Sequence, residues 1–279
     1  MTTATNRADT SRPILLNCND AVTAEEIGHV FLVTINRPEA RNAVNPDVIR
    51  GVGRALEHAE ECPGIRAVVI TGSGDKAFCA GADLKSAAVG AFGEIPEGME
   101  QWGFAGFVKH HISKPTIAAI NGFALGGGTE IVLASDLAIA SSEAVFGLPE
   151  VKLGIFAGAG GAFRAGQQVP KKIAMEMLLT GQPLPAQRAL EIGLVNRVVP
   201  PEEVLPAALE LARQICENAP LAVQTTKRIA NGITDGTVES DQADWARSEW
   251  EAQKLMRSTD FMEGMRAFAE KRAPQWQGE

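Results

Sequence analysis

Short runs of β-branched and other apolar residues alternate with stretches of helical spacing over the first two thirds of the chain. Four runs are predicted to be strands, at 30–35, 67–71, 116–120 and 137–140. Between the first two, residues 46–61 place apolar side chains three or four positions apart, which predicts a helix, and Asn45 is suited to cap its amino end. Strands that alternate with helices predict an α/β fold.

The pattern changes after Val199, where four stretches have helical spacing: 201–218, 221–231, 242–256 and 261–271. We therefore predict three parts: a flexible, polar amino-terminal tail at 1–12, an α/β core at 13–199 and a helical carboxy-terminal region at 200–279. Between Ala87 and Trp102 the sequence is rich in glycine, proline and acid, which predicts a mobile loop.

Composition narrows the class of protein. The chain has 279 residues, 45% of them hydrophobic, which is enough for a sizeable core. Its formal net charge of -8 gives no general attraction for nucleic acid or anionic membranes. We expect no secretory signal and no membrane segment, because the longest apolar run, 115–140, is interrupted by glycines and acids. Four scattered cysteines without a CxxC pair predict reduced thiols, no zinc or other metal site and a cytoplasmic location.

Two glycine-rich turns follow predicted strands. Residues 76–85 read KAFCAGADLK, and residues 121–130 read NGFALGGGTE and lead into an apolar helical run. Small residues let a ligand oxygen approach a backbone N–H, and a helix start carries partial positive charge, so one N–H from each turn could form an oxyanion hole. A close-packed structural turn is the alternative for the first. The second lacks GxxxxGK[ST] and the spacing of a dinucleotide fingerprint.

Two glutamates lie in this apolar, glycine-rich context. Glu130 ends the second turn, and Glu150 follows the sequence FGLP. An ionised carboxylate is costly in such surroundings unless it is solvated or used. A pair of carboxyl groups suits the addition of water to a carbon–carbon double bond, because one deprotonates water while the other protonates carbon. From the residues alone, Glu130 could equally interact with the helix dipole and Glu150 could be a hydrogen-bonded buried acid.

Taken together, these segments resemble the enoyl-CoA hydratase/isomerase, or crotonase, family. The resemblance runs from about residue 21 onward, with matching segments at 36–43, 77–84, 121–130, 146–154, 158–161, 178–181 and 186–195. It implies a crotonase-like α/β spiral of ββα units with a helical carboxy-terminal trimerisation region. It also implies a homotrimer, or a hexamer made of two trimers.

The resemblance further assigns roles to individual residues. The backbone N–H groups of Ala82 and Gly127 would bind the thioester oxygen of an acyl-CoA and stabilise an enolate. Glu130 would orient and deprotonate water, and Glu150 would deliver or remove the α-proton. Coenzyme A is carried on the substrate, so no separate cofactor is implied. Its expected contacts are Arg41, Ala43, Ala80, Ala82, Asp83, Leu84, Lys85 and Gly127, with Arg37 a further cation near its phosphates.

The activity implied is that of an acyl-CoA hydro-lyase, the reversible addition of water to a 2-enoyl-CoA giving a 3-hydroxyacyl-CoA, since family members that hydrate use both glutamates. An enoyl-CoA isomerase, or a non-catalytic acyl-CoA-binding scaffold of the same fold, is the alternative. Segments 83–88, 103–106 and 267–276 resemble the carnitinyl-CoA dehydratase branch, which would make carnitinyl-CoA dehydration a specialised version of the same chemistry.

A carnitinyl group carries a trimethylammonium, which aromatic side chains could bind. Trp102, Phe104 and Phe156 are the candidates in the sequence. His110 and His111 could suggest a pair of bases, but their place before SKP favours a role at the end of a helix or on the surface.

Overall fold

The computed structural model describes residues 12–14, 20–83 and 95–279, which form two sheets and the helices around them. The larger sheet has seven strands in the order β1-β2-β3-β4-β6-β8-β11. Their bounds are Arg12–Ile14, Val22–Ile27, Val30–Ile35, Ala67–Gly72, Thr116–Ile120, Leu137–Ser141 and Arg197–Val199. The pairs β1–β2 and β2–β3 are antiparallel, and every pair from β3 to β11 is parallel.

A smaller sheet of short strands has the order β10-β9-β7-β5. Its strands are β5 (Ala77–Cys79), β7 (Phe123–Leu125), β9 (Val145–Gly147) and β10 (Leu184–Pro185). Each of β5, β7 and β9 follows a parallel strand of the larger sheet, so the small sheet lies at the carboxyl ends of those strands. This order of long strand, short strand and helix is the expected ββα repeat.

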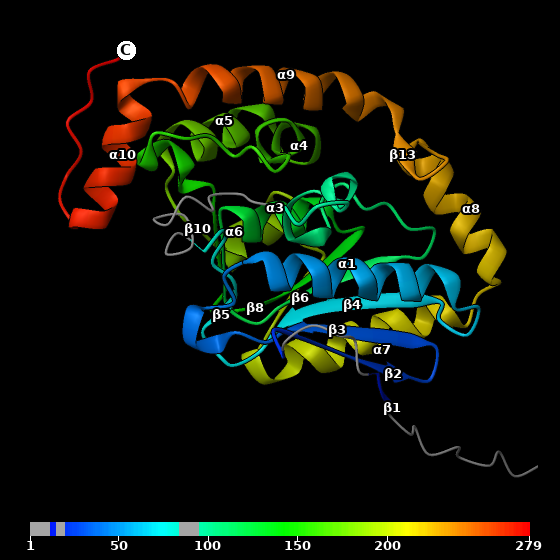
Figure 1. The fold of residues 1–279 in the computed structure, drawn as a ribbon. Coiled ribbons are helices and arrows are strands. Elements are labelled where there is room, and N and C mark those ends of the chain that lie inside the picture. Colours follow the sequence, from blue (N-terminus) through cyan, green and yellow to red (C-terminus); the bar gives the residue numbers. More distant parts are fainter. Residues whose placement is uncertain (1–11, 15–19, 84–94) are drawn as a thin grey trace, which may run out of the picture.

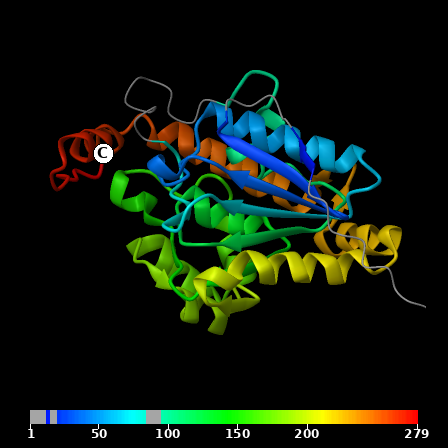
Figure 2. The same ribbon diagram turned by 90° about the horizontal axis from the view of Figure 1, so that it is seen from below.

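Helices cover both faces of the larger sheet (Figure 1). Helix α1 (Pro46–Glu61) packs on one face together with Phe31 and Val33, whereas α7 (Val204–Cys216) packs on the other with Val30 and Leu32. Successive side chains of β3 therefore enter opposite cores, as the period of two in a strand requires. The view from below shows the strands of the larger sheet running alongside helices (Figure 2).

The carboxy-terminal helices leave the sheet after α7. Their bounds are α8 Pro220–Asn231, α9 Glu239–Leu255 and α10 Thr259–Glu270, with a small hairpin of β12 (Ile233–Thr234) and β13 (Thr237–Val238) before α9. Helix α9 runs across α4 (Gly161–Gln168) and α5 (Lys171–Thr180), on the side of the molecule that also carries α3 (Gly127–Ala134) (Figure 1). The remaining helix is α6 (Ala186–Glu191). Helix α9 thereby returns to segments that lie far before it in the chain.

The four predicted strands and the helix at 46–61 are confirmed, and the Asn45 side chain accepts a hydrogen bond from the Val48 N–H at 3.0 Å as a cap. The four carboxy-terminal helices are confirmed to within three residues at each end. The helix expected before residue 113 is wrong, because residues 107–112 form a turn and extended chain. Residues 1–11 of the predicted tail at 1–12, and residues 88–94 of the loop predicted between Ala87 and Trp102, lie outside the described residues. No described helix is both long and apolar enough to cross a membrane.

Candidate active site

A cavity of about 400 Å³ lies between the start of α1, the start of α3 and the inner side of α9. Its lining is mainly apolar, and it includes both predicted glutamates, Glu130 and Glu150, together with Ala82 and Gly127. Residues from four distant parts of the chain are thus brought together. An apolar cavity with a few convergent polar groups is the usual form of a small-molecule site.

The two glycine-rich turns meet at one wall of this cavity. Gly81 has a φ of +89°, and a Cβ placed on it would lie 3.3 Å from the Gly127 nitrogen. The Val44 N–H donates to the Gly81 carbonyl, and the Asp83 N–H donates to the Val44 carbonyl. In such a parallel bridge the residue between, Ala82, turns its own N–H away from Val44.

Gly127 is the first residue of α3, so its N–H is among the four that have no partner within the helix. The partial positive charge of the helix start favours an oxygen that gains negative charge. Two backbone donors on adjoining turns, both lining the cavity, therefore form the arrangement that an oxyanion hole needs.

Glu130 lies in the first turn of α3 and is 3% exposed. One of its carboxylate oxygens, Oε1, accepts a hydrogen bond of 2.8 Å from the Gly161 N–H. The preceding Thr129 fixes this turn, because its hydroxyl donates to the carbonyl oxygens of Ala124 and Gly147. The position of Glu130 is thus set by both the small sheet and the start of α4.

Glu150 lies in a 3-10 helix, Pro149–Leu153, that follows β9. It is 8% exposed, and its Oε2 atom is buried without a hydrogen-bond partner among the described residues. A Cβ on Gly126 would lie 3.1 Å from Glu150 Oε1, so the carboxylate packs directly against the start of α3. A buried carboxylate oxygen without a partner is costly, which suits a group that meets a substrate or water.

Burial raises the pKa of both glutamates above their ordinary value. The negative charge of Glu150 raises the pKa of Glu130 further, whereas the N–H groups of Gly161 and Ala159 lower it by less. Two like charges in a dry site cannot both ionise readily, so the pair titrates as a unit that holds one proton over an intermediate range of pH. In that state one carboxylate can accept a proton while the other donates one.

Next to the cavity, Arg164 of α4 forms a buried ion pair with Asp241 at the start of α9, at 3.0 Å. Its guanidinium also donates to the Val108 carbonyl at 2.8 Å and lies 5.3 Å from the ring centroid of Trp245. The positive charge of Arg164 lowers the pKa of Glu130 to a small extent. One side chain thus joins α9 to the core and acts electrostatically on a glutamate.

The residues expected to contact coenzyme A fall into three groups. Ala80, Ala82, Asp83 and Gly127 line the cavity. Arg41 is exposed and Ala43 is buried, and neither belongs to the cavity lining as described. Leu84 and Lys85 lie outside the described residues. Arg37 forms an ion pair with Asp83 at 2.9 Å and donates to the Ala43 carbonyl, so its charge is already engaged at the cavity edge.

Of the three aromatic residues expected to contact the acyl group, two line the cavity and one does not. Phe104 and Phe156 line the cavity, but Trp102 stacks on His110 with ring centroids 5.1 Å apart and donates to Glu57. The expectation for Trp102 as a ligand contact is therefore wrong, because its ring fills the space above Gly53 of α1.

Sequence reasoning missed the contribution of α9. Trp245 and Glu249 of this helix line the cavity with Lys109, whose Nζ lies 4.4 Å from the Trp245 ring centroid and 3.3 Å from Glu249 Oε1. The helical spacing of 242–256 predicts an apolar face but not which cavity the face covers. Nothing in the sequence joins Lys109 to residues 136 and 140 positions later.

The two adjacent histidines are not part of the cavity lining as described. His110 Nε2 lies 2.8 Å from Glu57 Oε1, and burial lowers the pKa of His110. Burial lowers the pKa of His111 to about 4. Both histidines are therefore packed into the structure away from the cavity, and neither lies at the end of a helix.

Three comparisons with known proteins agree with this geometry. The profile of the enoyl-CoA hydratase/isomerase family matches residues 25–279. A carnitinyl-CoA dehydratase of Proteus mirabilis (strain HI4320) is 40% identical over 265 residues, which cover 90% of this chain and 96% of that protein.

Solved structures give the same result. A carnitinyl-CoA dehydratase from Mycobacterium avium 104 is 56% identical, with a TM-score of 0.88 over 93% of this chain and 99% of that one. An enoyl-CoA hydratase from Mycobacterium tuberculosis H37Rv is 41% identical, with a TM-score of 0.72 over 94% and 100%. The expected crotonase-type α/β fold is thereby confirmed.

Proposed function

The chain belongs to the enoyl-CoA hydratase/isomerase family, and on that premise we propose that it is an acyl-CoA hydro-lyase, which adds water reversibly to a 2-enoyl-CoA to give a 3-hydroxyacyl-CoA. The observation that carries this proposal is the presence of Glu130 and Glu150 in the lining of one cavity, beside two backbone donors. A single carboxylate would serve proton transfer alone. Two serve water chemistry, since water needs a base and carbon needs an acid.

In this mechanism the thioester oxygen accepts hydrogen bonds from the N–H groups of Ala82 and Gly127. Glu130 takes a proton from water as the water oxygen forms a bond to the β-carbon. The electron pair of the double bond moves to give an enolate at the thioester oxygen, where the two N–H groups stabilise it. Glu150 then protonates the α-carbon. Dehydration follows the same steps in reverse.

The direct test is hydration of crotonyl-CoA, followed by the loss of enone absorbance. We expect Glu130→Gln and Glu150→Gln each to lower kcat by about 10²–10⁴-fold, the range that a positioned acid or base contributes. Glu176→Gln is the matched control, because Glu176 is exposed on α5. An enzyme that kept its hydration rate after both substitutions would contradict the proposal.

The alternative function, an enoyl-CoA isomerase, needs Glu150 but not a second carboxylate. It predicts that double-bond migration in a 3-enoyl-CoA survives Glu130→Gln and is lost in Glu150→Gln. A non-catalytic scaffold predicts neither activity, and calorimetry with an acyl-CoA would then decide between binding and no function at this cavity. Oε2 of Glu150 is buried and has no hydrogen-bond partner in the part of the chain that the structure describes, which favours catalysis over a scaffold.

For the acyl group, we propose enoyl and carnitinyl substrates as two versions of one chemistry. A trimethylammonium would find an aromatic face at Trp245 and a carboxylate at Glu249, both in the cavity lining and both now in contact with Lys109. Parallel assays with crotonyl-CoA and crotonobetainyl-CoA measure the preference.

We propose that eight residues contact coenzyme A: Arg41, Ala43, Ala80, Ala82, Asp83, Leu84, Lys85 and Gly127. The position of Ala80, Ala82, Asp83 and Gly127 in the cavity lining supports four of them. A crystal with a bound acyl-CoA tests the set.

We also propose a homotrimer, or a hexamer of two trimers, in the cytoplasm. Large apolar side chains are exposed along the last three helices: Leu221, Ile229, Trp250, Met256, Met262 and Phe268. Exposed apolar surface of this kind marks interfaces. Because α7 packs on the sheet, the assembling part of region 200–279 would begin with α8. Mass measurement in solution decides between trimer and hexamer.

A further inference from the structure

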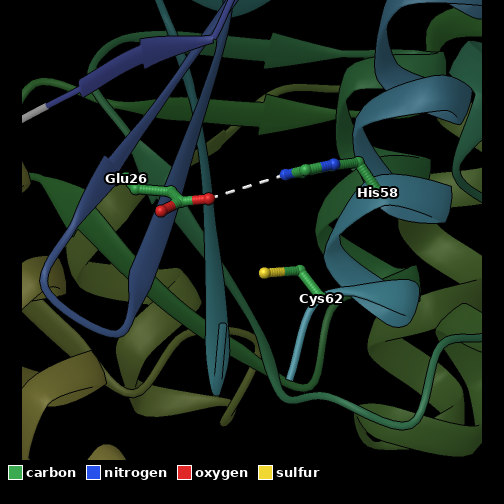
Figure 3. Close-up of side chains that lie close together, drawn as sticks. All are labelled: Glu26, His58 and Cys62. Carbon is green, nitrogen blue, oxygen red and sulfur yellow. Dashed lines mark ion pairs between the residues drawn. The ribbon is translucent and has the colours of Figure 1, made fainter. Parts of the chain in front are cut away.

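Three metal-ligating side chains converge at the carboxyl end of α1. They are Glu26 of β2, His58 of α1 and Cys62, the residue that ends α1. One donor atom from each lies within 4.8 Å of the other two, and His58 Nε2 is 3.5 Å from Glu26 Oε1. Figure 3 shows the three side chains pointing toward a common space.

The fold explains why these residues meet. Every second residue of β2 lies on the face toward α1, and these residues are Val22, Ala24 and Glu26. Val22 and Ala24 enter the core beneath α1, and Glu26 places a carboxylate next in the same row. His58 and Cys62 are four positions apart and share one side of α1. Phe31 pairs with Glu26 across the hairpin, and its ring packs 5.5 Å from the His58 ring.

The His58 ring nitrogen Nε2 is buried and has no hydrogen-bond partner among the described residues. A second histidine–glutamate pair beside the same helix gives a comparison. There, His110 Nε2 lies 2.8 Å from Glu57 Oε1, a full contact. The 3.5 Å separation at His58 leaves room between the two atoms, and a buried polar atom without a partner calls for a ligand.

The charges at this position suit a cation. On binding a metal, Cys62 would lose its proton and supply one negative charge, and the Glu26 carboxylate would supply a second, which together balance a divalent ion. Lys114 already donates to the carbonyl oxygens of Glu60 and Cys62 at this end, so the ligands of a metal would be the three side chains and not these backbone carbonyls.

We propose that Glu26, His58 and Cys62 bind one divalent metal ion of the zinc type. Zinc takes nitrogen, sulfur and oxygen ligands at about 2.0–2.3 Å in a tetrahedron, which places ligands roughly 3.3–3.6 Å apart. The donor atoms lie within 4.8 Å of one another, so by that measure they would have to approach by about 1.5 Å at most. Glu26 and His58 are 32% and 38% exposed, so their side chains can adjust and water can complete the fourth position.

The site would be independent of the cavity. Asn45 and Ile49 of the first turn of α1 line the cavity, whereas His58 and Cys62 are at the other end, roughly 20 Å away at 1.5 Å per residue. A metal here would join the β2–β3 hairpin to α1 and stabilise the folded chain without contacting the acyl-CoA. Its failure would therefore leave the proposed hydro-lyase function untouched.

The test uses the full chain without an affinity tag, freed of metal by a chelator and kept reduced. On titration with Co²⁺ we expect one ion per chain and a thiolate-to-cobalt charge-transfer absorption, which Zn²⁺ displaces. Cys62→Ser should abolish this absorption, and Glu26→Gln should weaken binding by at least about tenfold, the smallest effect of disturbing even a ligand's supporting partner. Cys216→Ser is the thiol control and should retain it.

Absence of the absorption in the unmodified chain, or its survival in Cys62→Ser, would overturn the proposal. If circular dichroism shows that Cys62→Ser does not fold, His58→Asn replaces it, because that side chain is partly exposed. In a second measurement, Zn²⁺ should raise the midpoint of thermal unfolding of the unmodified chain but not of His58→Asn. Hydration of crotonyl-CoA should be unchanged in all these variants.

Discussion

Arg164 with Asp241, and Glu130 with Glu150, are two pairs of buried charged side chains beside the same cavity. The first pair has opposite charges 3.0 Å apart, and Arg164 has a further partner in the Val108 carbonyl. The second pair has like charges, raised pKa values and an oxygen that has no hydrogen-bond partner within residues 20–83 and 95–279. The two pairs therefore have different roles. The oppositely charged pair holds α9 on the core, whereas the two glutamates remain reactive at a cost to stability.

The largest effect on stability is expected from Arg164→Met. It leaves the Asp241 carboxylate buried without its counter-ion, which should lower the free energy of unfolding by about 3–5 kcal/mol. Urea denaturation measures this. The double substitution Arg164→Met with Asp241→Leu should recover most of the loss, because no unpaired charge remains.

The exposed pair Arg188–Glu191 provides the control, since Arg188→Met should cost less than about 1 kcal/mol. Equal losses in the free energy of unfolding at Arg164 and Arg188 would mean that burial of the ion pair does not matter. The contrast between the two buried pairs would then have no basis.

The opposite sign is expected for Glu130→Gln. The pKa of Glu130 is raised in the folded state, so the folded state binds more protons than the unfolded chain above pH 4.5, and stability falls as pH rises. Glutamine removes this penalty while its carbonyl can still accept from the Gly161 N–H. We expect a gain of about 1–3 kcal/mol near pH 8, which is less than the whole shift would give at about 1.4 kcal/mol per unit, because Glu130 shares the titration with Glu150.

Below pH 4.5 the gain should vanish, because the carboxyl is then protonated in the unfolded chain as well as in the folded state. Thermal unfolding at several pH values measures the trend, with Glu176→Gln as an exposed control. A gain that did not depend on pH would point to packing and not to charge.

The sequence predicted much of this site for local reasons. Helix α1 and its Asn45 cap follow from the spacing of apolar residues, and Glu130 and Glu150 could be chosen because acids are out of place in apolar, glycine-rich sequence. Strands such as β5 and β7, with three residues each, are too short to show a period of two. These strands position the two glycine-rich turns, but their sequences show no alternation of apolar and polar residues that would predict them.

Contacts between distant segments could not be predicted in the same way. The pairing of Arg164 with Asp241 joins residues 77 positions apart, and either side chain alone reads as an ordinary surface charge. Trp102 is a reasonable ligand candidate by residue type, but its ring stacks on His110 and packs over Gly53 of α1. Tertiary packing decides such cases.

A smaller effect is expected in the pH dependence of kcat/KM. If Glu130 is the base, its pKa sets the acid limb of the profile, and the Arg164 charge lowers that pKa. Arg164→Met should move the acid limb to higher pH, whereas Arg164→Lys should leave it nearly in place because the charge remains. A shift of equal size in both variants would indicate a structural role of Arg164 alone.

The smallest effect tests the cavity end formed by α9. Lys109 and Glu249 are partly exposed, so Lys109→Met should change the free energy of unfolding by less than about 1 kcal/mol. The same substitution removes the ammonium from the face of Trp245 and frees the Glu249 carboxylate for a cationic acyl group. A cation–π contact at such a site is worth about 0.5–1 kcal/mol, so KM for crotonobetainyl-CoA should fall by about two- to fivefold while KM for crotonyl-CoA stays constant.

Lys254→Met is the matched control for Lys109→Met. Lys254 Nζ lies 3.2 Å from the ring centroid of Trp250, which is 54% exposed and does not belong to the lining of the cavity as described. The two substitutions remove the same charge from the same kind of ring on the same helix, but only Trp245 lines the cavity and only Lys109 contacts Glu249. Equal changes in KM for both would show that net charge, and not the Trp245 face, governs the preference.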